Sequence, residues 1–186
     1  MRQDAGINGD AQRIEQMTWL FFLKVYDSQE ETWEFKAMSD GKKFESIIPK
    51  KFRWRNWAVD EKDGEALTGD ALLEFINGAE GLFQTLKNLP IDANTPRGKS
   101  IVKEVFSDLN QYMKNGILLR QVINVIDEID FSDADDRHTF GDIYEGILKD
   151  LQSAGNAGEF YTPRALTDFM VKTLQPKLGE KFGDFT

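Results

Sequence analysis

Hydrophobic residues recur every three or four positions in six stretches of the chain, which is the period of an amphipathic helix. The first stretch starts at Ala11 and continues to about Val25. It is apolar around much of its circumference, so we expect a helix at the centre of the core. The other five predicted helices span residues 69 to the high eighties, 97–112, 117–129, 140–151 and 164–174. The first ten residues are polar and include two glycines, and we expect them to fray.

Residues 29–57, between the first two predicted helices, show no sustained helical period. Asp40-Gly41 indicates a turn, and Ile48 precedes a proline and is therefore expected to be extended. Residues 52–57 then alternate aromatic and polar side chains, as a half-buried strand or an irregular loop does. The sequence therefore predicts a mainly α fold, an N-terminal helical bundle domain with one short irregular or β segment.

Basic residues concentrate in this irregular segment. The net charge of −9 argues against a surface that binds nucleic acid everywhere, but residues 42–57 hold six basic residues and one acid. The candidate contacts to DNA or to a partner are Lys50, Lys51, Arg53 and Arg55, because interleaved Arg and Trp suit phosphates and base stacking. The interpretation we favour is that the tryptophans anchor the loop to the core while the basic groups stay solvated. An acidic protein partner or DNA remains open for the charged side.

The composition also bears on compartment. The chain has no cysteine, which excludes disulfides, thiolate zinc sites and cysteine nucleophiles. The longest apolar run near the N-terminus, residues 19–23, is far shorter than the ~20 residues that span a bilayer. We therefore expect a cytoplasmic protein that does not associate with a membrane.

Two stretches resemble functional motifs, but each lacks a feature that the motif requires. Residues 93–100 fit a permissive phosphate-binding loop, but the preceding residues 87–92 are no core strand. Six acids lie in residues 127–136, yet an EF-hand there would need glycine and glutamate where His138 and Tyr144 stand. His138 is the only histidine and has no evident nucleophile to serve. We therefore assign no catalytic residue and no metal ligand.

Residues 155–164 are the stretch best suited to a ligand. Two glycines free the backbone, two aromatic residues follow, and Thr162-Pro163 then opens the predicted helix 164–174. A threonine is a good N-cap and a proline is a good first helical residue. The exposed amides of such a helix start, beside a flat aromatic surface, suit a small polar ligand with a flat ring. The alternative is an ordinary loop between helices.

Four segments carry further motifs: residues 14–24 (IEQMTWLFFLK), 44–49 with 52–58 (FESIIP and FRWRNWA), 141–148 (GDIYEGIL) and 158–164 (GEFYTPR). Together and in this order they resemble the N-terminal part of the DNA-modification (M, or HsdM) subunit of type I restriction enzymes. The resemblance covers nearly the whole chain after the first ten or so residues.

This resemblance implies S-adenosyl-L-methionine-dependent methylation of adenine N6 in DNA. It also implies double-stranded DNA, a specificity subunit, a restriction subunit and a second M subunit as partners. Residues 1–152 would be a helical domain that contacts DNA and subunits. Residues 153–186 would be a linker and the first helix of a truncated α/β methyltransferase domain. The first cofactor-binding segment would comprise Glu159, Phe160, Tyr161, Thr162, Pro163 and Arg164.

The chain departs from the family in two motifs. It has neither the glycine-rich cofactor loop nor the Asn-Pro-Pro-aromatic motif that would hold a flipped adenine, and it contains no two adjacent prolines. We therefore expect a fragment that has no methyltransferase activity alone and binds S-adenosylmethionine weakly or not at all. The alternative is a non-catalytic helical module that binds an acidic protein partner or DNA. A glycine-rich loop in the next ~50 residues of the reading frame would favour the enzyme.

Overall fold

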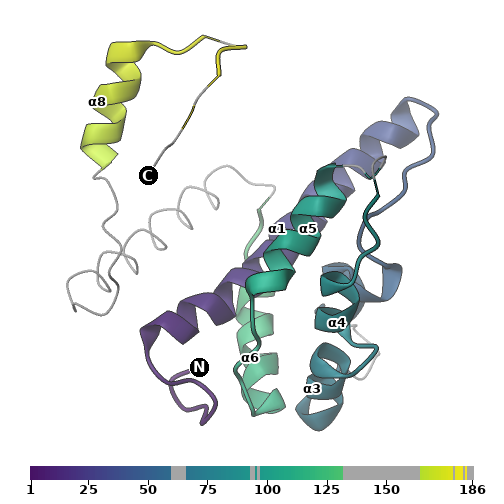
Figure 1. Cartoon of the computed structure of the whole chain (residues 1–186). Helices are drawn as coiled ribbons and strands as arrows, with labels where there is room; N and C mark the ends of the chain where they lie inside the picture. The colour runs from purple at the N-terminus through teal and green to yellow at the C-terminus, as the bar shows by residue number, and fades with distance from the viewer. Residues whose placement is uncertain are drawn as a thin grey trace. The chain divides into compact units, whose positions relative to one another are not determined.

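The computed structural model describes residues 1–59, 66–92, 95, 97–131, 164–177, 179–181 and 183. The chain divides into two compact units, Met1–Ile147 and Leu148–Thr186, each described by itself. The described part of the first unit contains these helices in chain order: α1 (Asp10–Ser39), the 3-10 turn η1 (Lys50–Phe52), α2 (Trp54–Trp57), α3 (Gly69–Asn77), α4 (Leu82–Lys87), α5 (Arg97–Asp108) and α6 (Gly116–Asp127) (Figure 1). The second unit contains α8 (Arg164–Leu174).

The mainly α fold is confirmed, and no strand occurs within the described ranges. α8 has the same bounds as the helix predicted from its sequence. The predicted helix 140–151 and the predicted domain boundary after residue 152 lie outside the described residues.

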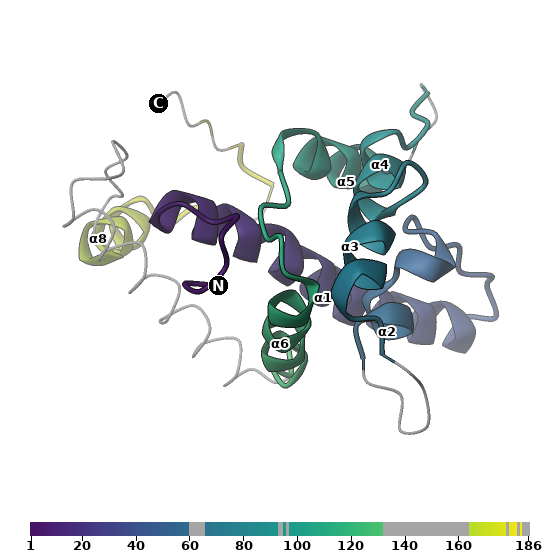
Figure 2. The same ribbon diagram turned by 90° about the horizontal axis from the view of Figure 1, so that it is seen from below.

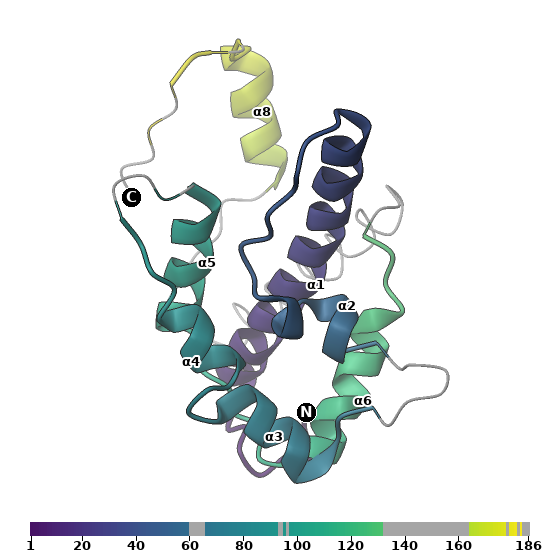
Figure 3. The ribbon, with the colours of Figure 1, turned by 90° about the vertical axis from the view of Figure 1, so that its right-hand side faces the viewer.

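The long helix α1 is the centre of the first unit. It contacts α6 and α2, while α3 contacts both α4 and α6. Figure 3 shows α4 and α5 on one side of α1 and α6 on the other, and Figure 2 shows α3 and α4 next to each other. Trp19 of α1 packs edge-on against Phe83 of α4, which packs in the same way against Phe106 of α5. These buried rings join three helices into one core.

The prediction that residues 29–57 lack a sustained helix is wrong for residues 29–39, because α1 continues through them to Ser39. The apolar period fades there, with Asp27 and Glu30 buried on the helix in place of large hydrophobic residues. These acids face the arginines of the segment that follows. The helix therefore persists while its buried face changes from apolar to ionic.

The predicted helix from residue 69 into the high eighties is divided in two. α3 ends at Asn77, and α4 begins at Leu82 after a short turn. Gly81 sits so close to this turn that a Cβ atom would lie 2.8 Å from the backbone N of Gly78 and 2.9 Å from the backbone O of Phe75. Only glycine fits such an approach, so the single predicted helix is interrupted completely at this turn.

The first ten residues are not frayed, which contradicts the sequence prediction. Ile7 is buried in the core, and Asp4 is 4% exposed. The Asp4 carboxylate accepts hydrogen bonds from the backbone N–H groups of Gly6 at 2.8 Å, Lys114 at 3.0 Å and Asn115 at 2.9 Å. The N-terminal loop is thereby fixed to the turn that precedes α6.

We expect replacement of Asp4 by alanine to lower the free energy of unfolding by about 1–3 kcal/mol, because buried amides lose their acceptor. Burial alone would raise the pKa of Asp4, but its three amide donors hold the pKa below the ordinary value. The carboxylate therefore stabilises the fold fully above its unfolded-state pKa, and this contribution is lost as pH falls through the lower folded-state pKa.

Urea unfolding at pH 7, pH 5 and pH 3 measures this effect. Asp4→Ala should lose less stability than the parent chain on acidification, and the exposed neighbour replacement Gln3→Ala should follow the parent. Equal acid sensitivity of Asp4→Ala and the parent would contradict the assignment.

Candidate functional site

The basic segment predicted to contact DNA or a partner packs on the acidic end of α1. Phe52, Trp54 and Trp57 are buried, at 0%, 1% and 5% exposed. They belong to η1 and α2, so the predicted strand or loop is two short helical turns. The indole N–H of Trp57 donates to the carbonyl oxygen of Phe52, which closes the turn on itself. The interpretation is confirmed for the tryptophans, which anchor this segment to the core. It is wrong for Arg53 and Arg55, which were expected to stay solvated but pair with acids of α1.

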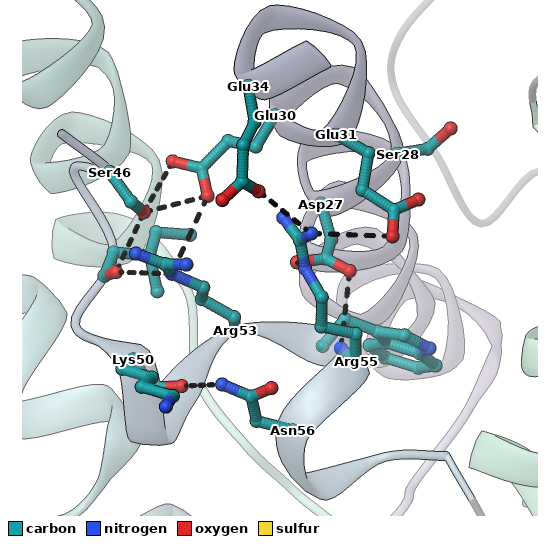
Figure 4. A network of polar contacts seen from close by, with 12 residues as sticks. Asp27, Ser28, Glu30, Glu31, Glu34, Ser46, Lys50, Arg53, Arg55 and Asn56 are labelled. Atoms are coloured by element: carbon teal, nitrogen blue, oxygen red, sulfur yellow. Dashed lines mark hydrogen bonds and ion pairs between the residues drawn. The ribbon is translucent and has the colours of Figure 1, made fainter. Parts of the chain in front are cut away.

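Arg55 lies against three carboxylates of α1 (Figure 4). Its Nε is 3.1 Å from Oδ1 of Asp27, and its Nη1 is 3.1 Å from Oε2 of Glu34 and 3.4 Å from Oε1 of Glu31. Its backbone N–H also donates to Asp27. Burial alone would lower the pKa of Arg55, but the charge of Asp27, followed by those of Glu31 and Glu34, raises it.

Burial decides which of these pairs matters most. Glu31 and Glu34 are 59% and 41% exposed, so water and salt screen their attraction to Arg55. Asp27 is 7% exposed and accepts both a guanidinium and a backbone hydrogen bond. Among the three ion pairs of Arg55, the one with Asp27 therefore contributes most to holding α2 on α1.

Glu30 holds the start of the same segment. Its side chain is 1% exposed and accepts hydrogen bonds from the hydroxyl of Ser46 at 2.7 Å and the backbone N–H of Ile47 at 3.3 Å. Nε of Arg53 is 4.0 Å from its Oε2 and also donates to the carbonyl of Ile48. Burial raises the pKa of Glu30, although the hydroxyl, the amide and Arg53 act in the opposite direction. Together with Asp27, Glu30 fixes residues 46–55 on α1.

Lys50 and Lys51 differ from the two arginines because both are exposed. The ammonium of Lys51 lies 4.5 Å from the ring centroid of Phe52 and 3.3 Å from the carbonyl oxygen of Glu80. Asn56 donates to the carbonyl of Lys50 and so links η1 to α2. The structure thus separates the four predicted contact residues into two lysines on the surface and two arginines paired with acids of α1. Contact of any of them with DNA or a partner stays a prediction.

The predicted cofactor segment is described only at its end. Glu159, Phe160, Tyr161, Thr162 and Pro163 lie outside the described residues, and Arg164 is described only as the first residue of α8. The apolar side chains of α8 that are more than two-fifths exposed are Leu166, Phe169, Met170, Val171 and Leu174. α8 thus carries an apolar set that the second unit does not bury.

The described residues contain no group of three or more His, Asp or Glu side chains arranged to hold a metal ion, and His138 lies outside them. None of the described helices combines the length and apolar character needed to cross a bilayer.

Two polar residues of α6 escaped the sequence prediction. Arg120 is 7% exposed and donates to the carbonyl oxygens of Leu67 at 2.7 Å, Ala58 at 2.7 Å and Trp57 at 3.2 Å. Oδ1 of Asp127 accepts from Nζ of Lys24 and from the indole N–H of Trp54, each at 2.7 Å. Both residues join α6 to the basic segment, and no spacing in the sequence indicates either pairing.

Comparison with known proteins places this fold among restriction-system subunits. The family described as "HsdM N-terminal domain" matches residues 1–126, and the family described as "N-6 DNA Methylase" matches residues 135–186. The chain is 60% identical over 186 residues to the type I restriction enzyme EcoEI methylase subunit of Escherichia coli, covering 99% of this chain and 36% of that protein. It is 30% identical over 91 residues to the StySPI methylase subunit of Salmonella potsdam, covering 46% of this chain and 17% of that protein.

Two solved structures share the architecture. One is described as a modification subunit of a type I restriction enzyme from Vibrio vulnificus, with a TM-score of 0.81, 39% identity and coverage of 97% of this chain and 39% of that one. The other concerns complex assembly and conformational transition of a type I R-M system, with a TM-score of 0.74, 34% identity and coverage of 96% and 34%. The chain therefore spans little more than a third of the length of these relatives.

Proposed function

The chain belongs to the family of DNA-modification (HsdM) subunits of type I restriction enzymes, of which it carries the N-terminal region, and from this premise we propose that the whole protein methylates adenine N6 in DNA. The observation that carries the proposal is the match to the HsdM N-terminal domain over residues 1–126, followed by the N-6 DNA Methylase match from residue 135. S-adenosyl-L-methionine would supply the methyl group. The partners would be double-stranded DNA, a specificity subunit, a restriction subunit and a second M subunit.

The helical unit would contribute contacts to DNA or to another subunit through Lys50 and Lys51. Both are exposed on η1, which the buried Phe52 holds in place. Arg53 and Arg55 would hold the segment that carries these lysines on α1, because their guanidinium groups already pair with Glu30 and Asp27. A phosphate that approached the arginines would have to compete with those carboxylates, whereas Lys50 and Lys51 are exposed, and the contacts described for Lys51 are to a ring and a carbonyl oxygen.

We expect the double replacement Lys50→Glu and Lys51→Glu in the assembled enzyme to weaken DNA binding and to flatten its salt dependence. The slope of log K against log salt should fall by about 0.9 for each phosphate contact that is lost. Fluorescence anisotropy with labelled duplex DNA over a salt series measures both quantities.

The matched control for this experiment is Lys114→Glu, which reverses an exposed lysine on the turn before α6. It should leave the slope unchanged. An unchanged slope in the η1 variant would assign Lys50 and Lys51 to subunit contacts or to solubility. Retained DNA binding with loss of subunit assembly would assign them to the subunit interface.

The cofactor segment would be Glu159, Phe160, Tyr161, Thr162, Pro163 and Arg164, with Thr162 capping α8. The start of α8 at Arg164 supports this placement, because a helix that begins there directs its first free N–H groups toward the preceding residues. Such amides suit a carboxylate, and the aromatic side chains of Phe160 and Tyr161 suit an adenine ring.

We expect the 186-residue chain alone to transfer no methyl group to DNA. The Asn-Pro-Pro-aromatic catalytic motif of the family contains two adjacent prolines, and no two prolines are adjacent in this sequence. Incubation with isotopically labelled S-adenosylmethionine and duplex DNA, followed by counting of the DNA, measures the reaction. The full-length subunit assembled with its specificity subunit is the positive control. Methylation by the 186-residue chain at a rate near that of the control would contradict the proposal.

A further inference from the structure

An apolar groove of about 520 Å³ lies between α1, α6 and the N-terminal loop. Its lining includes Met17 and Phe21 of α1 and Val122 and Val125 of α6. Val125 is 64% exposed. Because apolar surface is stabilised when a partner removes it from water, the groove suits an apolar occupant.

α1 and α6 run in the same direction along this groove. Just before α6 begins, the backbone N–H of Tyr112 donates to Oε1 of Gln16. At the last residue of α6, Oδ1 of Asp127 accepts from Nζ of Lys24, which lies further along α1. The hydrogen bonds of Asp4 fix the N-terminal loop near the start of α6. The groove therefore has one end beside this loop and the other beside the end of α6.

The two ends of the groove carry opposite charges. Arg2, on the N-terminal loop, lines the groove at the first end. At the second end, Glu128 and Asp130 line an adjoining hollow that shares Ile129 with the groove. Both acids are exposed. The occupant with complementary charge has an acid at one end, a base at the other and apolar residues in between.

The shape of the groove favours a helix over a second copy of this chain. Two grooves that face each other leave space between them, and unfilled space forfeits the contacts that stabilise an interface. A helix is convex and packs against other helices at interaxial distances of about 8–10 Å. Its apolar residues at positions i, i+3, i+4 and i+7 would enter the groove. DNA suits this place poorly, because its phosphates would meet Glu128 and Asp130.

We propose that this groove binds an amphipathic helix of a partner protein. The apolar face of that helix covers Phe21 and Val125, and its ends place an acid near Arg2 and a base near Glu128. Such docking is independent of the methylation proposed above, because no residue of η1 or of the cofactor segment lines the groove.

Fluorescence anisotropy with two labelled helical peptides of about 15 residues tests this docking on the 186-residue chain. Both peptides carry the same stripe of leucines at helical spacing. The mixed-end peptide has lysine at one end and glutamate at the other, and the second peptide has lysine at both ends. The mixed-end peptide should bind saturably and about two- to fivefold more tightly. Arg2→Glu should reverse this order, because both ends of the groove then carry negative charge.

The apolar contact is tested by Val125→Asp, which should weaken binding of the mixed-end peptide by at least about tenfold, because docking would bury a charge. The matched control is Ile117→Asp, a similarly exposed residue of α6 that does not line the groove, and it should leave binding unchanged. The proposal would be overturned by absence of saturable binding, by equal losses in these two variants, or by a peptide order that Arg2→Glu does not reverse. It would also be overturned if sedimentation showed a dimer of the parent chain that Val125→Asp abolishes, since the groove would then belong to a second copy.

Discussion

Replacement of Arg120 by methionine should lower the free energy of unfolding of the helical unit by about 3–5 kcal/mol. The guanidinium donates to three carbonyl oxygens, two of which, those of Trp57 and Ala58, lie at the C-terminal end of α2. Methionine fills a similar volume but donates nothing, so these carbonyls would lose a charged donor in a dry environment. The loss of the positive charge at the end of α2 adds to the effect.

Equilibrium unfolding in urea, followed by tryptophan fluorescence, measures this change. Arg120→Lys should lose an intermediate amount, since one ammonium cannot reach carbonyls that a planar guanidinium bridges. Arg97→Met is the matched control, because Arg97 is exposed in the first turn of α5. An effect of Arg120→Met within about 0.5 kcal/mol of the parent chain would show that the three hydrogen bonds contribute little.

Helix starts and breaks were the features most accessible to sequence reasoning, because they depend on neighbouring residues. Thr162-Pro163 predicted a helix from residue 164, and α8 begins at Arg164. The sequence predicted a helix from residue 117, and α6 begins one residue earlier, at Gly116, where the Asn115 side chain accepts from the N–H groups of Ile117 and Leu118 as an N-cap. Local chemistry decides such positions, and local chemistry can be read from sequence.

The acidic face of α1 was missed although the sequence contains a signal for it. Asp27, Glu30, Glu31 and Glu34 follow helical spacing, and an arginine-rich segment lies about twenty residues later. A search for apolar periodicity alone ends the helix where these acids begin. A helix can, however, bury a charged face when matching charges cover it.

Arg120 and Asp4 could not be predicted in this way. The hydrogen bonds described for Arg120 end on backbone carbonyls, and those of Asp4 come from backbone amides. Backbone groups are present in every residue and leave no mark in the sequence. A single buried charge inside an apolar helix therefore looks like an ordinary surface residue until the fold is known.

Replacement of Asp127 by alanine should lower the free energy of unfolding by about 2–3 kcal/mol. Oδ1 of Asp127 accepts from the indole N–H of Trp54, which is 1% exposed, so the N–H would lose its acceptor inside the core. Lys24 would lose less, because its ammonium also donates to the carbonyl oxygen of Asp127, which alanine retains. The predicted loss therefore comes mainly from Trp54.

A double-mutant cycle separates these contributions. Trp54→Phe removes the indole donor, and in that background Asp127→Ala should cost about 1–2 kcal/mol less than in the parent chain. Glu128→Ala, at an exposed neighbouring position, is the control and should change stability by no more than about 0.5 kcal/mol. Additive effects of Asp127→Ala and Trp54→Phe would contradict the assignment. A coupled result would mean that α1, α2 and α6 share one polar junction at Asp127. The position of Lys50 and Lys51 on η1 would then depend on this junction, because η1 directly precedes α2.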